Sequence, residues 1–315
     1  MKTGFNRRQF SSASLAVLAT ATCGTAPESA VPDSTSALLP TVRWGRYDIT
    51  RLLLGHNPIK GQSHFSAALS RKMREHFADR EHGLALLRRC QQAGINTCQM
   101  GGPEIEALLE QHHAAGGRLQ WIATLYSQPG AGREELKRIL SLNPRPIGAQ
   151  VFGNMSDALM KRGQLDRVVE HLKVVRDSGL LVGLGSHNHE VIDYAENKGW
   201  DVDFYQCCFY HSVFGFDGRR GEVFEEEDRR AMVRTIRQVA KPCIGFKVLG
   251  ANRHCATPDA VERALRFAYA NIKPTDVVLV GMWQKHKDQV AENVGYVRRI
   301  LADLTRERTA RPGSL

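Results

Sequence analysis

The chain has 315 residues, 42% of them apolar and 24% charged, which is typical of a globular protein with enough length for one large domain or two small ones. Its formal net charge of +10 is spread through mixed-sign segments such as "RKMREHFADREH" at residues 71–82, which indicates solvated helix faces and argues against nucleic-acid binding. The seven cysteines show no paired spacing, so we expect no disulfide framework and predict buried thiols at Cys98, Cys207, Cys208 and Cys243.

The first residues have the features of an export signal. A twin-arginine pair in "NRRQF" at residues 6–10 precedes a mildly apolar run that is too short to span a bilayer. We therefore predict a twin-arginine signal over residues 1–23, read by the twin-arginine export machinery, and a periplasmic or otherwise exported protein with no stable membrane span. The small residues Ala19 and Ala21 favour cleavage, and lipid attachment at Cys23 is the alternative.

A regular alternation fills the middle of the chain. Residues 24–40 and 305–315 lack periodicity, so we expect a disordered linker and a disordered tail around one domain at residues 41–304. Within this domain, short apolar runs alternate with amphipathic segments of helix length. The runs predict strands at residues 49–55, 95–100, 119–125, 146–153, 180–185, 202–209, 241–249 and 276–282. Two intervening helices end at Gly94 and Gly179, and another begins with Thr257 as its cap.

Eight strand–helix units of even spacing predict an α/β fold, a (β/α)8 TIM barrel. An open doubly wound sheet is the alternative. The segment "TVRWGRYD" ahead of the first strand is expected to form a hairpin that closes the N-terminal end of the barrel. Catalytic groups in this fold lie at the C-terminal ends of the strands, so we searched for candidates there.

Several motifs, in their order and spacing, resemble those of the aldo/keto reductases from about Thr41 to Leu304. These are "VRWGRYDITRLLLGHNP", "ALLRRCQQAGINTCQM", "VGLGSHNHEVI", "VDFYQCCFYH" and "ENVGYVRRIL". The resemblance implies a catalytic tetrad of Asp, Tyr, Lys and His, and this chain departs from it. Gln99 takes the Asp position, Leu125 the Lys position and Phe152 or Gly153 the His position, and no Tyr follows Gln99 in "QMGGPEIE". Because hydride reduction of a carbonyl needs a proton donor, conventional tetrad chemistry is not expected here.

The resemblance also implies a binding site for NADP. It assigns Gln206 to the nicotinamide amide and Phe246 to the face of the nicotinamide ring. Gln289, Glu292 and Asn293 match the spacing of the adenosine-binding helix, and Lys285, with Lys287, lies in the preceding loop. Ser186 occupies the loop where the family has a Ser-Asn pair.

Other ionisable residues at the strand ends offer alternative chemistry. Four histidines, at His56, His187, His189 and His211, are candidate ligands of a divalent metal, although a helix that begins near Asn188 would turn His187 and His189 apart. The candidates for a replacement acid–base group are His56, Lys247 and Tyr210, with Gln99 left to orient a group. The long first loop, residues 61–80, is a candidate lid that carries His64.

We therefore expect a divergent aldo/keto reductase-like protein that binds NADP and acts on a small polar carbonyl or sugar-like substrate. A metal-dependent lyase, isomerase or hydrolase at the barrel mouth is the first alternative. A non-catalytic barrel that serves as a binding or scaffold protein is the second.

Overall fold

The computed structural model describes residues 37–211 and 224–310. The predicted export signal, the predicted linker as far as residue 36 and residues 311–315 of the predicted tail lie outside the described residues. Within them, no helix has both the length and the apolar character needed to cross a membrane.

Eight parallel strands of the described chain close into a barrel in the order β10-β3-β4-β5-β6-β7-β8-β9. The strands are β3 (Leu52–Gly55), β4 (Thr97–Met100), β5 (Gln120–Leu125), β6 (Gly148–Val151), β7 (Leu181–Ser186), β8 (Phe204–Cys208), β9 (Cys243–Phe246) and β10 (Val277–Gly281). Each strand pairs in parallel with its neighbours, and β10 pairs with β3 to complete the ring. The predicted (β/α)8 barrel is confirmed, and the open-sheet alternative is wrong.

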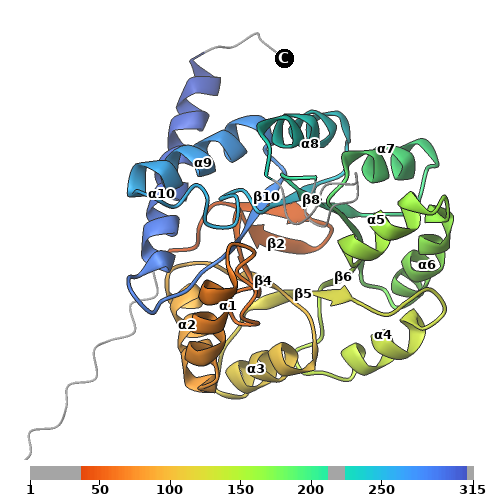
Figure 1. Ribbon diagram of the computed structural model, residues 1–315, viewed down its shortest axis with the longest axis horizontal. Helices are drawn as coiled ribbons and strands as arrows, with labels where there is room; N and C mark the ends of the chain where they lie inside the picture. The colour runs from red at the N-terminus through yellow and green to blue at the C-terminus, as the bar shows by residue number, and fades with distance from the viewer. Residues whose placement is uncertain (1–36, 212–223, 311–315) are drawn as a thin grey trace, which may run out of the picture. The chain divides into compact units, whose positions relative to one another are not determined.

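Helices surround this barrel in chain order, as Figure 1 shows. They are α1 (Ala67–Phe77), α2 (Arg80–Gln92), α3 (Pro103–Ala114), α4 (Gly132–Leu140), α5 (Gly153–Lys161), α6 (Val169–Asp177), α7 (His189–Asn197), α8 (Glu226–Gln238), α9 (Pro258–Asn271) and α10 (Gln289–Thr309), with a short 3₁₀ turn at Leu165–Val168. Thr257 caps α9 by accepting a hydrogen bond from the amide of Ala260, as expected. Gly94 and Gly179, predicted as helix stops, adopt φ values of 90° and 76°, which a residue without a Cβ atom reaches at no steric cost.

A two-stranded hairpin precedes the barrel, as predicted. Its strands β1 (Thr41–Trp44) and β2 (Tyr47–Thr50) pair antiparallel. The indole of Trp44 stacks against Phe204 at 5.4 Å and donates a hydrogen bond to the carbonyl of Thr275, which holds the hairpin against the barrel interior. The single strand predicted at residues 49–55 is therefore wrong in one respect. Its first residues belong to the hairpin and β3 begins at Leu52, a break hidden in the sequence because both parts are buried.

The barrel domain extends beyond both of its predicted ends, residues 41 and 304. Helix α10 continues to Thr309, so the tail predicted from residue 305 begins too early. At the other end, Leu39 is buried and its amide donates a hydrogen bond to the carbonyl of Gly94, so the last residues of the predicted linker are ordered. Apolar burial and backbone hydrogen bonds of Leu39 and Pro40 fix this segment, and these signals are too short to stand out in a Pro- and Ser-rich stretch.

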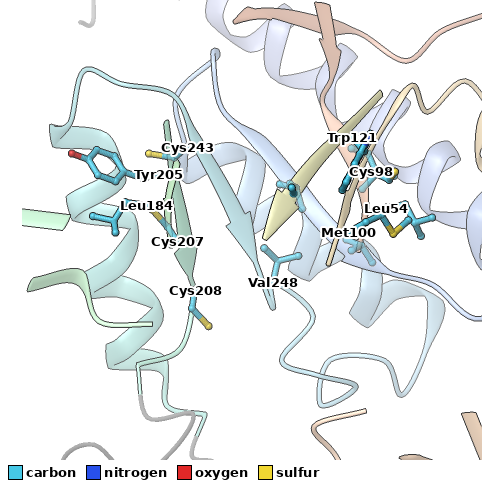
Figure 2. Close-up of a cluster of buried hydrophobic side chains, with 14 of the residues drawn as sticks. Leu54, Cys98, Met100, Trp121, Leu184, Tyr205, Cys207, Cys208, Cys243 and Val248 are labelled. Atoms are coloured by element: carbon cyan, nitrogen blue, oxygen red, sulfur yellow. The ribbon is translucent and has the colours of Figure 1, made fainter. Parts of the chain in front are cut away.

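Two apolar clusters hold the barrel together. The larger one fills the layer between strands and helices, and Figure 2 shows part of it, with Cys207 on β8 and Cys243 on β9. Cys98 and Cys208 are buried as well, as predicted. The smaller cluster closes the lower barrel interior and includes Ile122. Because side chains alternate along a strand, Thr124 lies on the same face as Ile122, nearer the C-terminal end. Inside the barrel, a polar layer at the C-terminal ends of the strands therefore covers an apolar layer nearer their N-terminal ends.

Candidate active site at the barrel mouth

A cavity of about 980 Å³ opens at the C-terminal end of the barrel. Residues at or just after the ends of all eight barrel strands line it, together with the first loop and the start of α10. This is the position at which (β/α)8 enzymes place their chemistry. Its volume is at the upper end of the range found for small-molecule and cofactor sites.

A tyrosine and a histidine form a hydrogen-bonded pair in this cavity. The hydroxyl of Tyr126 lies 3.2 Å from Nε2 of His56, and Nδ1 of His56 lies 3.0 Å from the carbonyl oxygen of Gln99. Since a carbonyl can only accept, Nδ1 carries the proton, and Nε2 accepts the hydrogen bond that Tyr126 donates. Burial lowers the pKa of His56 to about 4 and raises the pKa of Tyr126, so both side chains are neutral at pH 7.

Sequence reasoning identified His56 and missed Tyr126. The phenol directly follows the predicted third barrel strand, which is the strongest positional signal in this fold. The resemblance to the aldo/keto reductases places the catalytic tyrosine after the second strand. At the third strand it assigns only the lysine position, which falls on Leu125. Gln99 accepts a hydrogen bond from His56 through its backbone carbonyl, and its side chain donates a hydrogen bond to the hydroxyl of Thr124. The orienting role predicted for its side chain stays a prediction.

A lysine adds positive charge beside this pair. The ammonium group of Lys60 lies 4.8 Å from the centre of the Tyr126 ring and donates a hydrogen bond of 3.4 Å to the carbonyl of Gly101. Burial lowers the pKa of Lys60. Burial raises the pKa of the Tyr126 phenol, and the carboxylates of Glu135 and Glu106 act in the same direction.

A second acid–base pair borders the same cavity. Nδ1 of His187 lies 2.7 Å from Oδ2 of Asp157, and the backbone amide of His187 donates to the same carboxylate. Ser186 also donates to Asp157, across 2.5 Å. Burial lowers the pKa of His187, while the carboxylate of Asp157 acts in the opposite direction. Asp157 lies within helix α5 and not directly after a strand, so its position in the sequence does not point to the site.

Side-chain amides form the polar layer of the cavity. The Oε1 atoms of Gln150 and Gln206 and the Oδ1 atom of Asn154 are buried and accept no hydrogen bond from any described residue. All three residues line the cavity. Leaving a buried acceptor unsatisfied costs about 1–3 kcal/mol, so a ligand that brings N–H or O–H donors gains affinity at each position.

Most of the residues assigned to NADP line the cavity, and two do not. Gln206, Phe246, Gln289, Glu292 and Asn293 all line the cavity. Two of them also make internal contacts, since Oε1 of Gln289 accepts a hydrogen bond from the Trp283 amide and Glu292 forms an ion pair with Lys287 at 2.7 Å.

Ser186 and Lys285 do not line the cavity and are corrections to the predicted set. Ser186 is fully buried against Asp157, and the ammonium of Lys285 lies 5.9 Å from the ring centre of Trp283. Lys287, from the same loop, does line the cavity.

Tyr210 does not reach the cavity. Its hydroxyl is 2.7 Å from Nε2 of His254, and its side chain is buried among apolar neighbours. Strand β8 ends at Cys208, so the alternation of side chains no longer determines where Tyr210 points. Lys247, by contrast, lines the cavity, as predicted.

The four histidines proposed as metal ligands do not converge. His56 and His187 line the cavity, whereas His189 and His211 do not, and Nδ1 of His189 lies 3.4 Å from Asp193. Asn188 caps α7 at the position predicted for the helix start, which turns His189 away from His187. In the chain as described, no three His, Cys, Asp or Glu side chains are grouped so as to hold a metal ion.

Backbone strain is concentrated around this cavity. The non-glycine residues with positive φ in the described chain are His64, Lys247, Ala251 and Asn252, with φ between 47° and 80°, and all of them line the cavity. Such conformations cost about 1–3 kcal/mol each and cluster at functional sites. Arg253 donates a hydrogen bond of 3.1 Å to the carbonyl of His64, so the loop after β9 contacts the first loop.

Comparison with known proteins identifies no family. No model of a known protein family matches the chain, and no curated protein matches it. Among solved structures, it is similar to a truncated 3-deoxy-D-arabino-heptulosonate 7-phosphate synthase from Thermotoga maritima, with 10% identity over 87% of this chain and 93% of that one and a TM-score of 0.48. It is also similar to an archaeal fructose-1,6-bisphosphate aldolase, with 11% identity over 80% and 92% of the two chains and a TM-score of 0.45. At these identities and TM-scores the comparison does not bear on the reaction.

Proposed function

We propose that the protein is a divergent relative of the aldo/keto reductases that reduces a small, hydroxyl-bearing carbonyl compound with NADPH, and that Tyr126 is the proton donor. The observation that carries this proposal is the continuity of the cavity. One space connects the Tyr126–His56 pair with Gln206 and Phe246 and with the start of α10.

The residues present fit a nicotinamide cofactor. Gln206 offers a buried oxygen with no partner in the described chain, which suits the N–H groups of a carboxamide. At the α10 end, Nε1 of Trp283 is a buried donor without an acceptor in the described chain, and Lys287 adds a cation, which suits phosphate oxygens. When bound, the cofactor supplies the hydride.

Tyr126 supplies the proton in this scheme. Because its pKa is raised, the phenol remains protonated at neutral pH and donates to the more basic oxygen of a carbonyl under reduction. The bond between the phenol oxygen and its proton breaks as the new O–H bond forms. Lys60, beside the ring, stabilises the phenolate until solvent restores the proton.

The amide layer defines the substrate class. Gln150 and Asn154 present buried acceptors to the cavity, and hydroxyl groups of a sugar-like substrate would satisfy them. A purely apolar aldehyde would leave these acceptors unpaired. We therefore expect polyhydroxy carbonyl compounds to bind better than alkyl aldehydes of the same length.

Fluorescence tests the cofactor part directly, because Trp283 is one of four tryptophans and lines the cavity. Titration with NADPH should quench or shift the emission with saturation below the millimolar range. Gln206→Ala should weaken binding by about tenfold, a cost of about 1.4 kcal/mol. The matched control is Gln128→Ala, an exposed glutamine outside the cavity, which should leave the affinity unchanged. Absence of saturable binding at millimolar NADPH would overturn the proposal.

The Asp157–His187 pair supports a second candidate, an isomerase or lyase without hydride transfer. A neutral imidazole whose Nδ1 is held by a buried carboxylate can remove a proton next to a carbonyl, since the carboxylate stabilises the imidazolium that forms. Exchange of substrate C–H for deuterium in D₂O, in the absence of NADPH, would favour this candidate over reduction.

A further inference from the structure

A second cavity, of about 530 Å³, lies at the other end of the barrel. It is bordered by Arg51, by Tyr269 on α9 and by the C-terminal half of α10. Arg51 directly precedes β3, whereas His56 follows the same strand, so this cavity and the barrel mouth lie at opposite ends of β3.

Arg51 carries a buried charge in this cavity. The residue is only 8% exposed, and its Nε atom has no hydrogen-bond acceptor in the described part of the chain. Its guanidinium carbon lies 5.3 Å from the ring centre of Tyr269, a contact that satisfies none of its N–H groups. Burial lowers the pKa of Arg51.

The carboxylate that acts on Arg51 is already paired. Asp276 exerts a favourable charge effect on Arg51, but it accepts hydrogen bonds from the amide of Cys243 and from Lys273, with which it forms an ion pair at 2.9 Å. A buried guanidinium without an ionic partner is destabilising, so the fold retains Arg51 against a stability penalty.

Two further arginines surround the same space. Arg298 and Arg308 both line the cavity, and no Asp or Glu is among the described residues that do so. Arg298 also donates hydrogen bonds to the carbonyls of Ala37 and Leu38, which fixes its position. Arg308 lowers the pKa of Arg51 by charge repulsion, and both residues line this cavity.

We propose that this basic cavity binds the phosphate group of a small organic phosphate. Guanidinium groups hold phosphate oxygens through paired N–H donors, and three of them around one space attract a phosphate dianion. Leu301 and Leu304 give the cavity apolar walls, and its volume exceeds what a phosphate ion needs, so the ligand carries an organic part. This site is separate from the barrel mouth, and its failure would leave the proposed reductase activity untouched.

Calorimetric titration of the full-length protein with glycerol 3-phosphate, at constant ionic strength, tests the site. Glycerol is the matched uncharged probe, and inorganic phosphate shows whether the phosphate group suffices. We expect saturable binding of glycerol 3-phosphate and none of glycerol. Arg308→Ala, at an exposed position, should weaken binding by at least about tenfold, which corresponds to about 1.4 kcal/mol.

Arg306→Ala is the matched control, because Arg306 is exposed, lies on the same helix and does not line the cavity. Its affinity should equal that of the wild type. Arg51→Met provides a second readout: it should abolish phosphate binding and raise the Tm of the ligand-free protein by a few degrees, since a buried unpaired charge is removed. Equal loss of binding in Arg306→Ala and Arg308→Ala, or binding unaffected by Arg308→Ala, would overturn the proposal.

Discussion

The hydroxyl of Tyr126 donates a hydrogen bond to Nε2 of His56 although the two residues are 70 positions apart in the chain. His56 follows β3, Tyr126 follows β5, and the carbonyl of Gln99 on the intervening β4 accepts a hydrogen bond from Nδ1 of the imidazole. Three consecutive barrel strands thus fix the tautomer of the histidine and the direction of the phenol. The pair is the best-defined chemical group in the cavity.

Replacement of the phenol tests this assignment. Tyr126→Phe should lower the rate of carbonyl reduction by about 10²–10⁴-fold, since the proton donor is lost, and should leave the affinity for NADPH unchanged. Steady-state kinetics and the fluorescence titration measure the two effects separately.

The matched control is Tyr210→Phe. Tyr210 is also buried and hydrogen-bonded to a histidine, His254, but it does not line the cavity. Its replacement should leave kcat and KM near the wild-type values. Equal loss of activity in both variants would argue for a structural effect and against the role given to Tyr126.

Stability should depend on pH through His56. Its pKa falls from 6.5 in the unfolded chain to about 4 in the folded protein, so the unfolded state binds the additional proton between these values. The free energy of unfolding should therefore decrease by up to about 3 kcal/mol as the pH falls from 6.5 to 4. Urea denaturation at a series of pH values measures this dependence.

His56→Gln separates this contribution from that of His112, whose pKa is also lowered to about 4 by burial. The variant should lose part of the slope between pH 6.5 and 4 and retain the rest. If the slope is the same in the variant and the wild type, His56 is not buried in the neutral form.

Sequence reasoning reached the fold and part of the site. The even spacing of apolar runs predicted the barrel. Gln206, Phe246 and the start of α10, which the family resemblance assigned to NADP, line one cavity because strand ends and helix starts occupy fixed places in a (β/α)8 barrel. Their role toward a cofactor stays a prediction. The positions of two side chains could not be predicted from these fixed places. Asp157 reaches His187 from a helix, and Tyr210 turns into the apolar layer after its strand has ended.

Asp157 should contribute strongly to stability. It accepts hydrogen bonds from the side chain and backbone of His187 and from Ser186, all buried. Asp157→Asn replaces one acceptor oxygen with a donor and should lower the free energy of unfolding by about 2–4 kcal/mol, measured by the urea midpoint. The control is Asp177→Asn, which breaks an exposed pair with Lys173 and should cost less than about 0.5 kcal/mol. Similar losses in both variants would contradict the buried network.

Isotope transfer tests the central claim most directly. The protein is incubated with NADPH carrying deuterium at C4 of the nicotinamide and with a panel of hydroxy aldehydes and sugars, and the products are analysed by mass spectrometry. We predict one deuterium at the carbinol carbon of each product formed, with the rate of incorporation reduced about 10²–10⁴-fold in Tyr126→Phe. Products without deuterium from the cofactor, or with hydrogen exchanged only from solvent, would contradict the assignment of this barrel as a carbonyl reductase.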